Sequence, residues 1–310
     1  CCINCMHIFP DLHHLESKYR NQPFVVIGVH SGKFTQEKDP ENIRQAILRH
    51  NLEHPVAVDS DYAIWNAYAV RSWPTLVLID PEGYVAGAVS GEGHRETIDR
   101  TIGQVLQAHK RKGTLGEPMR FRTERASFQG GVLEFPGKVL ADAQRNRLFI
   151  SDTNHHRVLI ANLEGRVSVV AGTGEIGLTD GTFEQAQFHQ PQGMTLSADG
   201  NTLYVADTGN HAIRALDLVA GRVMRIAGTG EQSYGRNSNG PGRTTKLSSP
   251  WDLVRVEDRI YIATAGLHQI WFYDLKTKKV VGYAGTGQEA GVDGSRAGVD
   301  RRPAGDAPCR

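Results

Sequence analysis

The second half of the sequence repeats itself, and the repeat limits the folds that this half can adopt. Three segments each open on a residue followed by proline and end on Ala-Gly-Thr-Gly. The openings are Phe135-Pro136, Gln190-Pro191 and Ser249-Pro250, and the endings are residues 171–174, 227–230 and 284–287. Successive segments are about 55 residues apart. Internal repeats of roughly this length are typical of propellers and solenoids.

Short apolar segments inside each repeat have the length of β-strands. One of them occupies residues 148–153, and its counterparts are residues 203–208 and 260–265. Several short strands per repeat, separated by glycine-rich turns, favour the blade of a β-propeller. We therefore predict an all-β domain over residues 128–294. About three blades make it a partial propeller, because closed propellers use roughly four to eight.

The turn after each of these strands carries a recurring polar motif. Residues 152–158 and 207–214 resemble the Asp-Thr-x-Asn-His-x-Ile pattern of the NHL repeat family. The third unit has Thr264 and Leu267 in place of Asp and Asn, and it keeps His268. We interpret the acidic and amide residues as turn caps that satisfy backbone groups; they are Asp152, Asn154, Asp207 and Asn210. The histidines His156, His211 and His268 are predicted to pack between blades, with a metal-binding rim as the alternative.

A dithiol stands at the other end of the chain. Cys2-x-x-Cys5 comes directly before an amphipathic run of helical spacing, made by Ile8, Leu12, Leu15 and Tyr19. The N-terminus of a helix favours a thiolate over a thiol, and the thiolate is the species that attacks a disulfide. We therefore predict Cys2 as the nucleophile and Cys5 as the resolving thiol. Cys1 is an open competitor of Cys2 for Cys5.

The dithiol, Pro10 and the distant Trp73-Pro74-Thr75 together resemble the active site of thioredoxin-like proteins. The resemblance implies an α/β thioredoxin-like domain over residues 1–112 and a cis bond before Pro74. It implies that Pro74 acts with the two cysteines in catalysis and that Trp73 and Thr75 bind substrate. The order of a thioredoxin-like domain followed by NHL repeats is similar to the NHL-repeat-containing protein two-like family.

The pattern between these two motifs alternates between helices and strands, as in an α/β layer. Strands are predicted at 24–30, 55–59, 76–79 and 84–89, and helices at 41–52, 61–68 and 95–109. Residues 24–30 are continuously apolar, which predicts a strand buried on both faces. Trp65 and Tyr68 are expected on one buried helical face. The strand that precedes the dithiol in the resembling family is missing here, residues 113–127 read as a linker, and residues 295–310 form an unmatched tail.

Composition narrows the function. The chain has 310 residues and a net charge of +1, and three of its four cysteines lie in the first five residues. This distribution suits a redox or metal site rather than a disulfide framework. The charge balance argues against nucleic-acid binding, and no apolar run reaches the length of a membrane helix. We expect a cytoplasmic protein whose N-terminal segment is missing, since the chain begins with Cys and shows no signal peptide.

Together these features predict a thiol–disulfide exchange module, and thus a possible thiol-disulfide oxidoreductase, coupled to an NHL propeller that binds a protein partner. The expected substrate is a protein disulfide, with no cofactor, no metal, no nucleic acid and no membrane. A copper site from Cys1, Cys5 and His7 or His30 is disfavoured, because copper-chaperone thioredoxin folds have Pro where Met6 stands. Two alternatives remain open. One is a non-catalytic adaptor in which both modules bind proteins, and the other is a propeller lyase with a rim metal.

Overall fold

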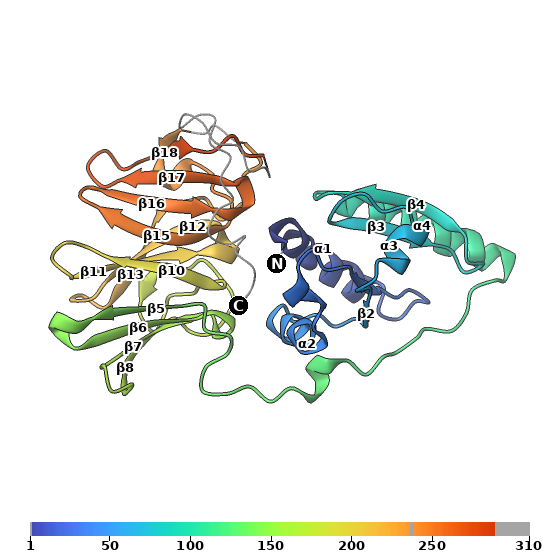
Figure 1. Cartoon of the computed structure of the whole chain (residues 1–310), viewed down its shortest axis with the longest axis horizontal. Coiled ribbons are helices and arrows are strands. Elements are labelled where there is room, and N and C mark those ends of the chain that lie inside the picture. The colour runs from blue at the N-terminus through green and yellow to red at the C-terminus, as the bar shows by residue number, and fades with distance from the viewer. Residues whose placement is uncertain (1, 236–238, 289–310) are drawn as a thin grey trace. The chain divides into compact units, whose positions relative to one another are not determined.

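The computed structural model describes residues 2–235 and 239–288 of the chain. It divides into two compact units, with the division between Gln129 and Gly130 (Figure 1). The predicted tail at 295–310, together with Cys1 and Cys309, lies outside the described residues. Within the described part, no helix is long and apolar enough to cross a membrane.

The first unit alternates helices and strands, as predicted. Its elements are α1 (Ile3–Lys18), β1 (Gly28–His30), α2 (Pro40–Arg49), β2 (Val56–Val58), α3 (Ala63–Ala67), β3 (Thr75–Ile79), β4 (Val85–Ser90) and α4 (Arg95–Lys112). Two short 3-10 helices lie at Thr35–Lys38 and Glu124–Ser127. The side chain of Asp39 accepts hydrogen bonds from the backbone N–H groups of Glu41 and Asn42, which fixes the start of α2.

Helices α1 and α4 form the core of this unit. The apolar stripe of α1 buries Leu15 and leads to the buried Tyr19, and both pack against Ile102 and Leu106 of α4. The helical spacing read from the sequence is therefore confirmed. Leu115, in the predicted linker, is partly buried against the same cluster. The start of the linker thus belongs to the packing of the first unit.

The strands of this unit form two separate pairs. β1 and β2 are parallel, and β3 and β4 are antiparallel. The prediction of one strand over 24–30, buried on both faces, is wrong: only Gly28–His30 is strand, and Ile27 and Val29 are 57% and 45% exposed. The reason is that β1 has a neighbour on one side only, so most of the apolar run has no backbone partner.

The prediction for the aromatic face of α3 is half right. Trp65 is half-buried, whereas Tyr68 is 43% exposed. Because α3 ends at Ala67, Tyr68 is the C-cap residue and does not continue the helical face. We therefore expect Trp65 to contribute more than Tyr68 to the packing of this helix.

The described part of the second unit contains three antiparallel sheets, each a run of consecutive strands (Figure 1). The first is β5 (Lys138–Asp142), β6 (Arg147–Asp152), β7 (Arg157–Ala161) and β8 (Val167–Ala171). The second is β10 (Pro191–Leu196), β11 (Thr202–Asp207), β12 (Ala212–Asp217) and β13 (Arg222–Ala227), with the short β9 (Gly181–Thr182) beside β13. The third is β15 (Pro250–Val256), β16 (Arg259–Thr264), β17 (Gln269–Asp274) and β18 (Lys279–Ala284), with β14 (Gly240–Pro241) beside β18.

Apolar side chains fill the space between successive sheets. Phe149 of the first sheet packs in one cluster with Leu203 of the second, and both are fully buried. Ile213 of the second sheet packs in another cluster with Ile262 and Trp271 of the third. Each repeat therefore buries one face against the next repeat, as stacked repeats must when one unit cannot enclose a core alone.

The recurring motif ties each sheet to the next. Thr153 donates its hydroxyl to the carbonyl oxygen of Pro191 at 2.8 Å, and Nδ1 of His156 accepts from the backbone N–H of Gln190 at 3.2 Å. The second repeat forms both bonds again: Thr208 donates to the carbonyl of Pro250, and His211 Nδ1 accepts from Ser249 N–H at 3.0 Å. The prediction of packed histidines between repeats is confirmed for these two.

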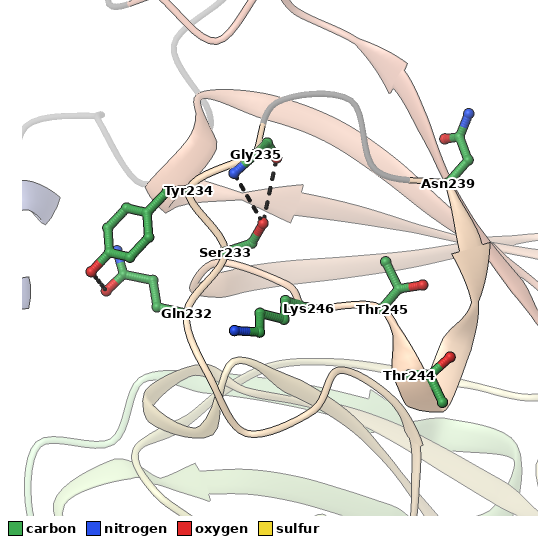
Figure 2. A pocket seen from close by; sticks show the side chains of 8 residues that line it. All are labelled: Gln232, Ser233, Tyr234, Gly235, Asn239, Thr244, Thr245 and Lys246. Carbon is green, nitrogen blue, oxygen red and sulfur yellow. Dashed lines mark hydrogen bonds between the residues drawn. The ribbon is translucent and has the colours of Figure 1, made fainter.

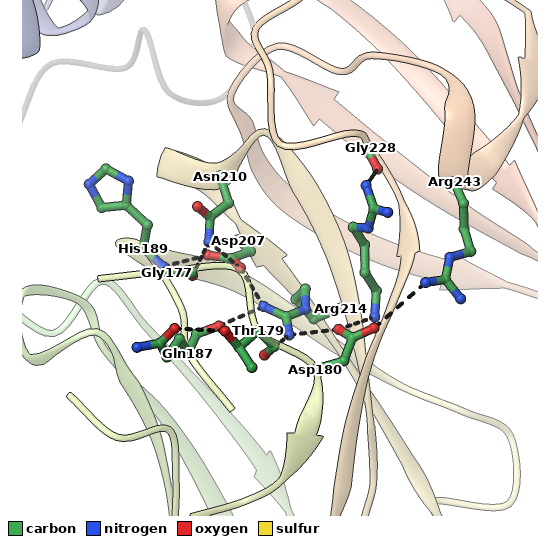
Figure 3. A network of polar contacts seen from close by, with 11 residues as sticks. Gly177, Thr179, Asp180, Gln187, His189, Asp207, Asn210, Arg214, Gly228 and Arg243 are labelled. Atoms are coloured by element: carbon green, nitrogen blue, oxygen red, sulfur yellow. Dashed lines mark hydrogen bonds and ion pairs between the residues drawn. The ribbon is translucent and has the colours of Figure 1, made fainter. Parts of the chain in front are cut away.

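The aspartate of the motif accepts a backbone hydrogen bond from a residue that precedes its own sheet strands. In the second repeat, fully buried Asp207 accepts from the backbone N–H of His189 at 2.8 Å and from Asn210 Nδ2 at 2.9 Å (Figure 3). It also pairs with Nη1 of the fully buried Arg214 at 3.0 Å. Burial raises the pKa of Asp207 to about 6, although Arg214 and the N–H donors oppose this. As predicted, Asp207 and Asn210 satisfy backbone groups, but these groups belong to the preceding segment: Asp207 accepts from His189 N–H, and Asn210 donates to the carbonyl of Gly177. The predicted turn cap is not formed, because the Asp207 side chain accepts no hydrogen bond from the 3-10 turn that follows it.

Candidate redox site

The two cysteines occupy the first turn of α1. Cys2 is the N-cap residue in an extended conformation, and its carbonyl accepts the first helical hydrogen bond from Met6 N–H at 3.1 Å. Cys5 lies one turn on, within the helix. Both are free and half-buried. The amphipathic spacing starts the helix here, so the dithiol lies at the positive end of the helix dipole.

The two thiols are electrostatically different. The pKa of Cys2 is lowered to about 6: a hydrogen bond from the Cys5 thiol contributes most, the backbone N–H of Cys5 and the positive charge of Lys33 add to it, and burial opposes them. The same hydrogen bond raises the pKa of Cys5 well above its usual range, and burial and the Cys2 charge add to the effect. Near neutral pH, Cys2 is therefore the thiolate and Cys5 holds the proton.

The Trp73-Pro74-Thr75 segment opens β3. The peptide bond before Pro74 is cis, as the resemblance implies, and Pro74 is buried. Trp73 donates its indole N–H to the carbonyl of Ser31 at 3.0 Å, and its ring lies 4.2 Å from that of Trp65, centroid to centroid. These contacts hold the Trp73 ring in one orientation at the end of the strand.

Thr75 uses its hydroxyl inside the β3–β4 hairpin. Oγ1 donates to the carbonyl of Ser72 at 2.8 Å and lies 2.9 Å from Oγ of Ser90. The role of Thr75 in binding substrate stays a prediction. The role of Trp73 in binding substrate and the role of Pro74 in catalysis also stay predictions.

Sequence reasoning missed the segment after β1. Lys33 places its ammonium 4.8 Å from the Trp73 ring centroid. Ser31 donates its hydroxyl to buried Asp59 at 2.7 Å, and Asp59 also accepts from the backbone N–H of Trp65 at 2.9 Å. The available signal was position: this segment leaves the carboxyl end of a parallel strand, where sites in α/β folds gather.

Two segments of the chain are similar to known protein families. Residues 1–85 match the model of the thioredoxin-like family, and residues 188–216 match the NHL repeat. The chain therefore contains a segment similar to the thioredoxin-like family and a segment similar to the NHL repeat. Its predicted resemblance to the NHL-repeat-containing protein two-like family is confirmed, since it is 38% identical to chicken NHL repeat-containing protein 2 over 93% of this chain.

Two further relatives show how much of the chain is similar to known proteins. Protein SUPPRESSOR OF QUENCHING 1, chloroplastic, from Arabidopsis thaliana is 43% identical over 95% of this chain. The chain spans 29% of that plant protein and 42% of the chicken protein. Thiol-disulfide oxidoreductase YkuV from Bacillus subtilis is 25% identical over 34% of this chain, which covers 70% of that protein.

The histidines near the dithiol have other partners. His7 Nδ1 lies 3.0 Å from the Glu92 carboxylate, and His30 Nε2 lies 2.8 Å from the carbonyl of Glu37. In the described residues, Asp80, Glu82 and His109 are close enough together to hold a metal. However, Asp80 approaches Nε2 of His109 at 3.6 Å and Glu82 approaches Nδ1 at 3.8 Å. The carboxylates therefore flank opposite nitrogens of one ring, which suits a clamp between hairpin and helix better than a metal tripod.

The NHL-repeat unit has a shallow polar pocket of about 420 Å³ (Figure 2). It is lined by Gln232, Ser233, Tyr234, Gly235, Asn239, Thr244, Thr245 and Lys246. Ser233 and Gly235 use their polar atoms on each other across the turn. Among the described residues of this lining, only Lys246 carries a charge, and it pairs with Glu231. These described residues therefore form no arrangement of acid, base and nucleophile.

Proposed function

We propose that the protein exchanges thiols and disulfides at Cys2 and Cys5, and that its NHL repeats bind a protein partner. The observation that supports the first part is the asymmetry of the dithiol, in which Cys2 is ionised near neutral pH and Cys5 holds the proton. A pair with separated pKa values is suited to distinct roles in a reaction. The resemblance to the Bacillus thiol-disulfide oxidoreductase supports the same activity.

The exchange takes place in two steps. The Cys2 thiolate attacks one sulfur of a protein disulfide, forming a Cys2–substrate disulfide and releasing the other substrate sulfur as a thiolate. Cys5 then loses its proton to that thiolate or to solvent and attacks the Cys2 sulfur. The products are a Cys2–Cys5 disulfide and a dithiol substrate, so the substrate gains the two electrons that the protein loses. A dithiol reductant restores the protein.

For the second unit, we propose that the three sheets are blades of a propeller. Each is an antiparallel run of four consecutive strands, and each packs a face on the next. Such blades present rigid loops, which are suited to binding a protein segment. The cytoplasmic location stays a prediction.

Reduction of insulin disulfides, followed by turbidity with a dithiol reductant, tests the exchange activity. We expect activity in the wild type and loss of activity in Cys2→Ser. In Cys5→Ser, the mixed disulfide between Cys2 and the substrate is expected to persist, because no resolving thiol is left. Mass spectrometry of this trapped species then identifies the protein that is attached to Cys2. Wild-type turbidity equal to that of Cys2→Ser would favour the adaptor function in which both units only bind proteins.

A further inference from the structure

The loop between β4 and α4 contacts both the helix of the dithiol and the hairpin that contains Pro74. On one side, the backbone N–H of Gly91 donates to the carbonyl of Pro74 at 2.9 Å. On the other side, Nδ1 of His7 lies 3.0 Å from Oε2 of Glu92. His7 lies in α1, two residues after Cys5. One short loop therefore joins the two parts of the proposed exchange site.

The contact between His7 and Glu92 is largely shielded from water. The two side chains are 7% and 16% exposed. A carboxylate only accepts hydrogen bonds, so Nδ1 of His7 carries the proton of this one. A hydrogen bond to a carboxylate is stronger than one between neutral groups, and shielding from water strengthens it further. The contact is therefore suited to holding the loop against α1.

Glu92 stands between two glycines that leave the backbone of the loop little restrained. Gly91 and Gly93 have φ angles of 91° and 79°, in the left-handed region that glycine adopts readily. At either glycine, a Cβ would meet no described atom within 4 Å beyond its chain neighbours. Packing does not fix the loop at these two residues, so the side chain of Glu92 has to do so.

The strands give this contact its importance. In the described residues, the β1–β2 pair and the β3–β4 hairpin share no backbone hydrogen-bond ladder. Side chains therefore set the position of the hairpin relative to α1. Leu78 of β3 packs against the cluster that contains Leu15 of α1, and the bond from His7 to Glu92 adds a directional contact near the dithiol.

We propose that His7 and Glu92 are positioning residues of the exchange site, whose contact keeps the dithiol helix and the strand that opens at Pro74 in one relative position. This inference rests on the proposed exchange function and assigns two residues to it. Neither residue takes part in making or breaking a bond. A site that is already ordered loses less conformational freedom when a protein disulfide binds, and it holds the reacting sulfurs in line.

Amide hydrogen exchange of the full chain, resolved by overlapping peptides, tests the contact itself. In His7→Leu, the amide of Gly91 is expected to exchange about tenfold faster, because the loop opens more often. Glu92→Ala removes the same contact from the other side. We expect the same increase there, and no further increase in the double variant. His7→Asn keeps an N–H donor close to the position of Nδ1 and is expected to exchange as the wild type does.

Insulin reduction tests the effect on exchange. In His7→Leu, kcat/KM for insulin is expected to fall about tenfold. The rate at which iodoacetamide alkylates Cys2 is expected to stay equal to that of the wild type, which separates a change of position from a loss of the thiolate. Arg95→Gln is the control, because it removes another contact between α4 and α1, at 3.5 Å from Asp11. We expect it to equal the wild type in all three measurements.

Unchanged amide exchange in His7→Leu would overturn the proposal, and so would an equal loss of insulin reduction in Arg95→Gln. Alkylation of Cys2 that slows as much as insulin reduction would also overturn it, since His7 would then act on the thiol itself. A wild type that reduces no insulin would refute the exchange function, on which the amide exchange does not depend.

Discussion

At the scale of single residues, the separation between the two cysteines has a measurable consequence. Since the pKa of Cys2 is lowered to about 6, its alkylation rate is expected to rise with pH through that value and level off above it. Cys5, whose pKa is raised, is expected to react slowly throughout. Peptide-resolved alkylation between pH 4 and 9 measures both rates. Equal rates for the two cysteines, or a Cys2 midpoint near that of an ordinary thiol, would contradict the assignment.

Arg214 gives a second prediction at this scale. Arg214→Met leaves the fully buried carboxylate of Asp207 without its cation, which is expected to cost roughly 3–5 kcal/mol of unfolding free energy. The control is Arg157→Met in the first repeat. There the arginine pairs with Asp152 but is 28% exposed, and His155 remains as a partner. We expect a loss of about 1–2 kcal/mol for this control.

Urea unfolding of these two variants, of Asp207→Asn and of Asp207→Asn/Arg214→Met measures these effects. The double variant removes both charges, so we expect it to be more stable than Arg214→Met alone. If the double variant loses as much as the sum of the two single changes, the pair is not coupled and the interpretation fails.

At the scale of elements, the hydrogen bond that links the first sheet to the second depends on a neutral imidazole. His156 Nδ1 accepts a backbone N–H, and burial lowers the pKa of His156 to about 4. Above pH 6.5 the ring is neutral whether the protein is folded or unfolded. As the pH falls from 6.5 towards 4, the unfolded chain takes up a proton that the folded chain does not, so stability decreases by up to about 2 kcal/mol.

The substitution His156→Asn tests this joint, because asparagine tolerates the left-handed backbone at this position (φ 50°) and keeps an acceptor. We expect the loss of stability between pH 7 and pH 5 to be smaller in this variant than in the wild type, as measured by urea midpoints. His156→Ala, which lacks the acceptor, is expected to be less stable at pH 7. An identical pH dependence in the wild type and in His156→Asn would show that the joint does not titrate.

The elements also show what a sequence can and cannot predict. Helix α1 was predictable because its stripe is set by local spacing, and the units of the second half were predictable because they repeat. The length of β1 was not, since it depends on how many neighbours the strand has. Arg214 was missed because Leu159 and Trp271 occupy the matching positions of the other units. Lys33 was missed because its aromatic partner is distant in sequence.

At the scale of the whole molecule, one prediction concerns the segment that links the two units. If the NHL repeats bind the protein that carries the substrate disulfide, tethering raises its effective concentration near the dithiol. We predict that cutting the chain at a specific protease site inserted near Gly116 leaves turnover of a small disulfide unchanged. Turnover of the trapped protein substrate is expected to fall. An unchanged rate for that substrate after complete cleavage would mean that the repeats serve another purpose.

The joints between repeats have one further consequence. In the first two repeats, a threonine and a histidine bond to main-chain atoms of the following repeat; they are Thr153 and His156, and Thr208 and His211. A main-chain carbonyl is present whatever residue stands there, and an N–H is present unless that residue is proline. A repeat can therefore change the side chains at these acceptor and donor positions without losing these hydrogen bonds. The third repeat accordingly lacks the Asp and Asn of the motif, while the hydrogen bonds that link it to the second repeat are intact. Sequence drift is therefore tolerated unit by unit, and gain or loss of a whole repeat leaves every remaining joint chemically complete.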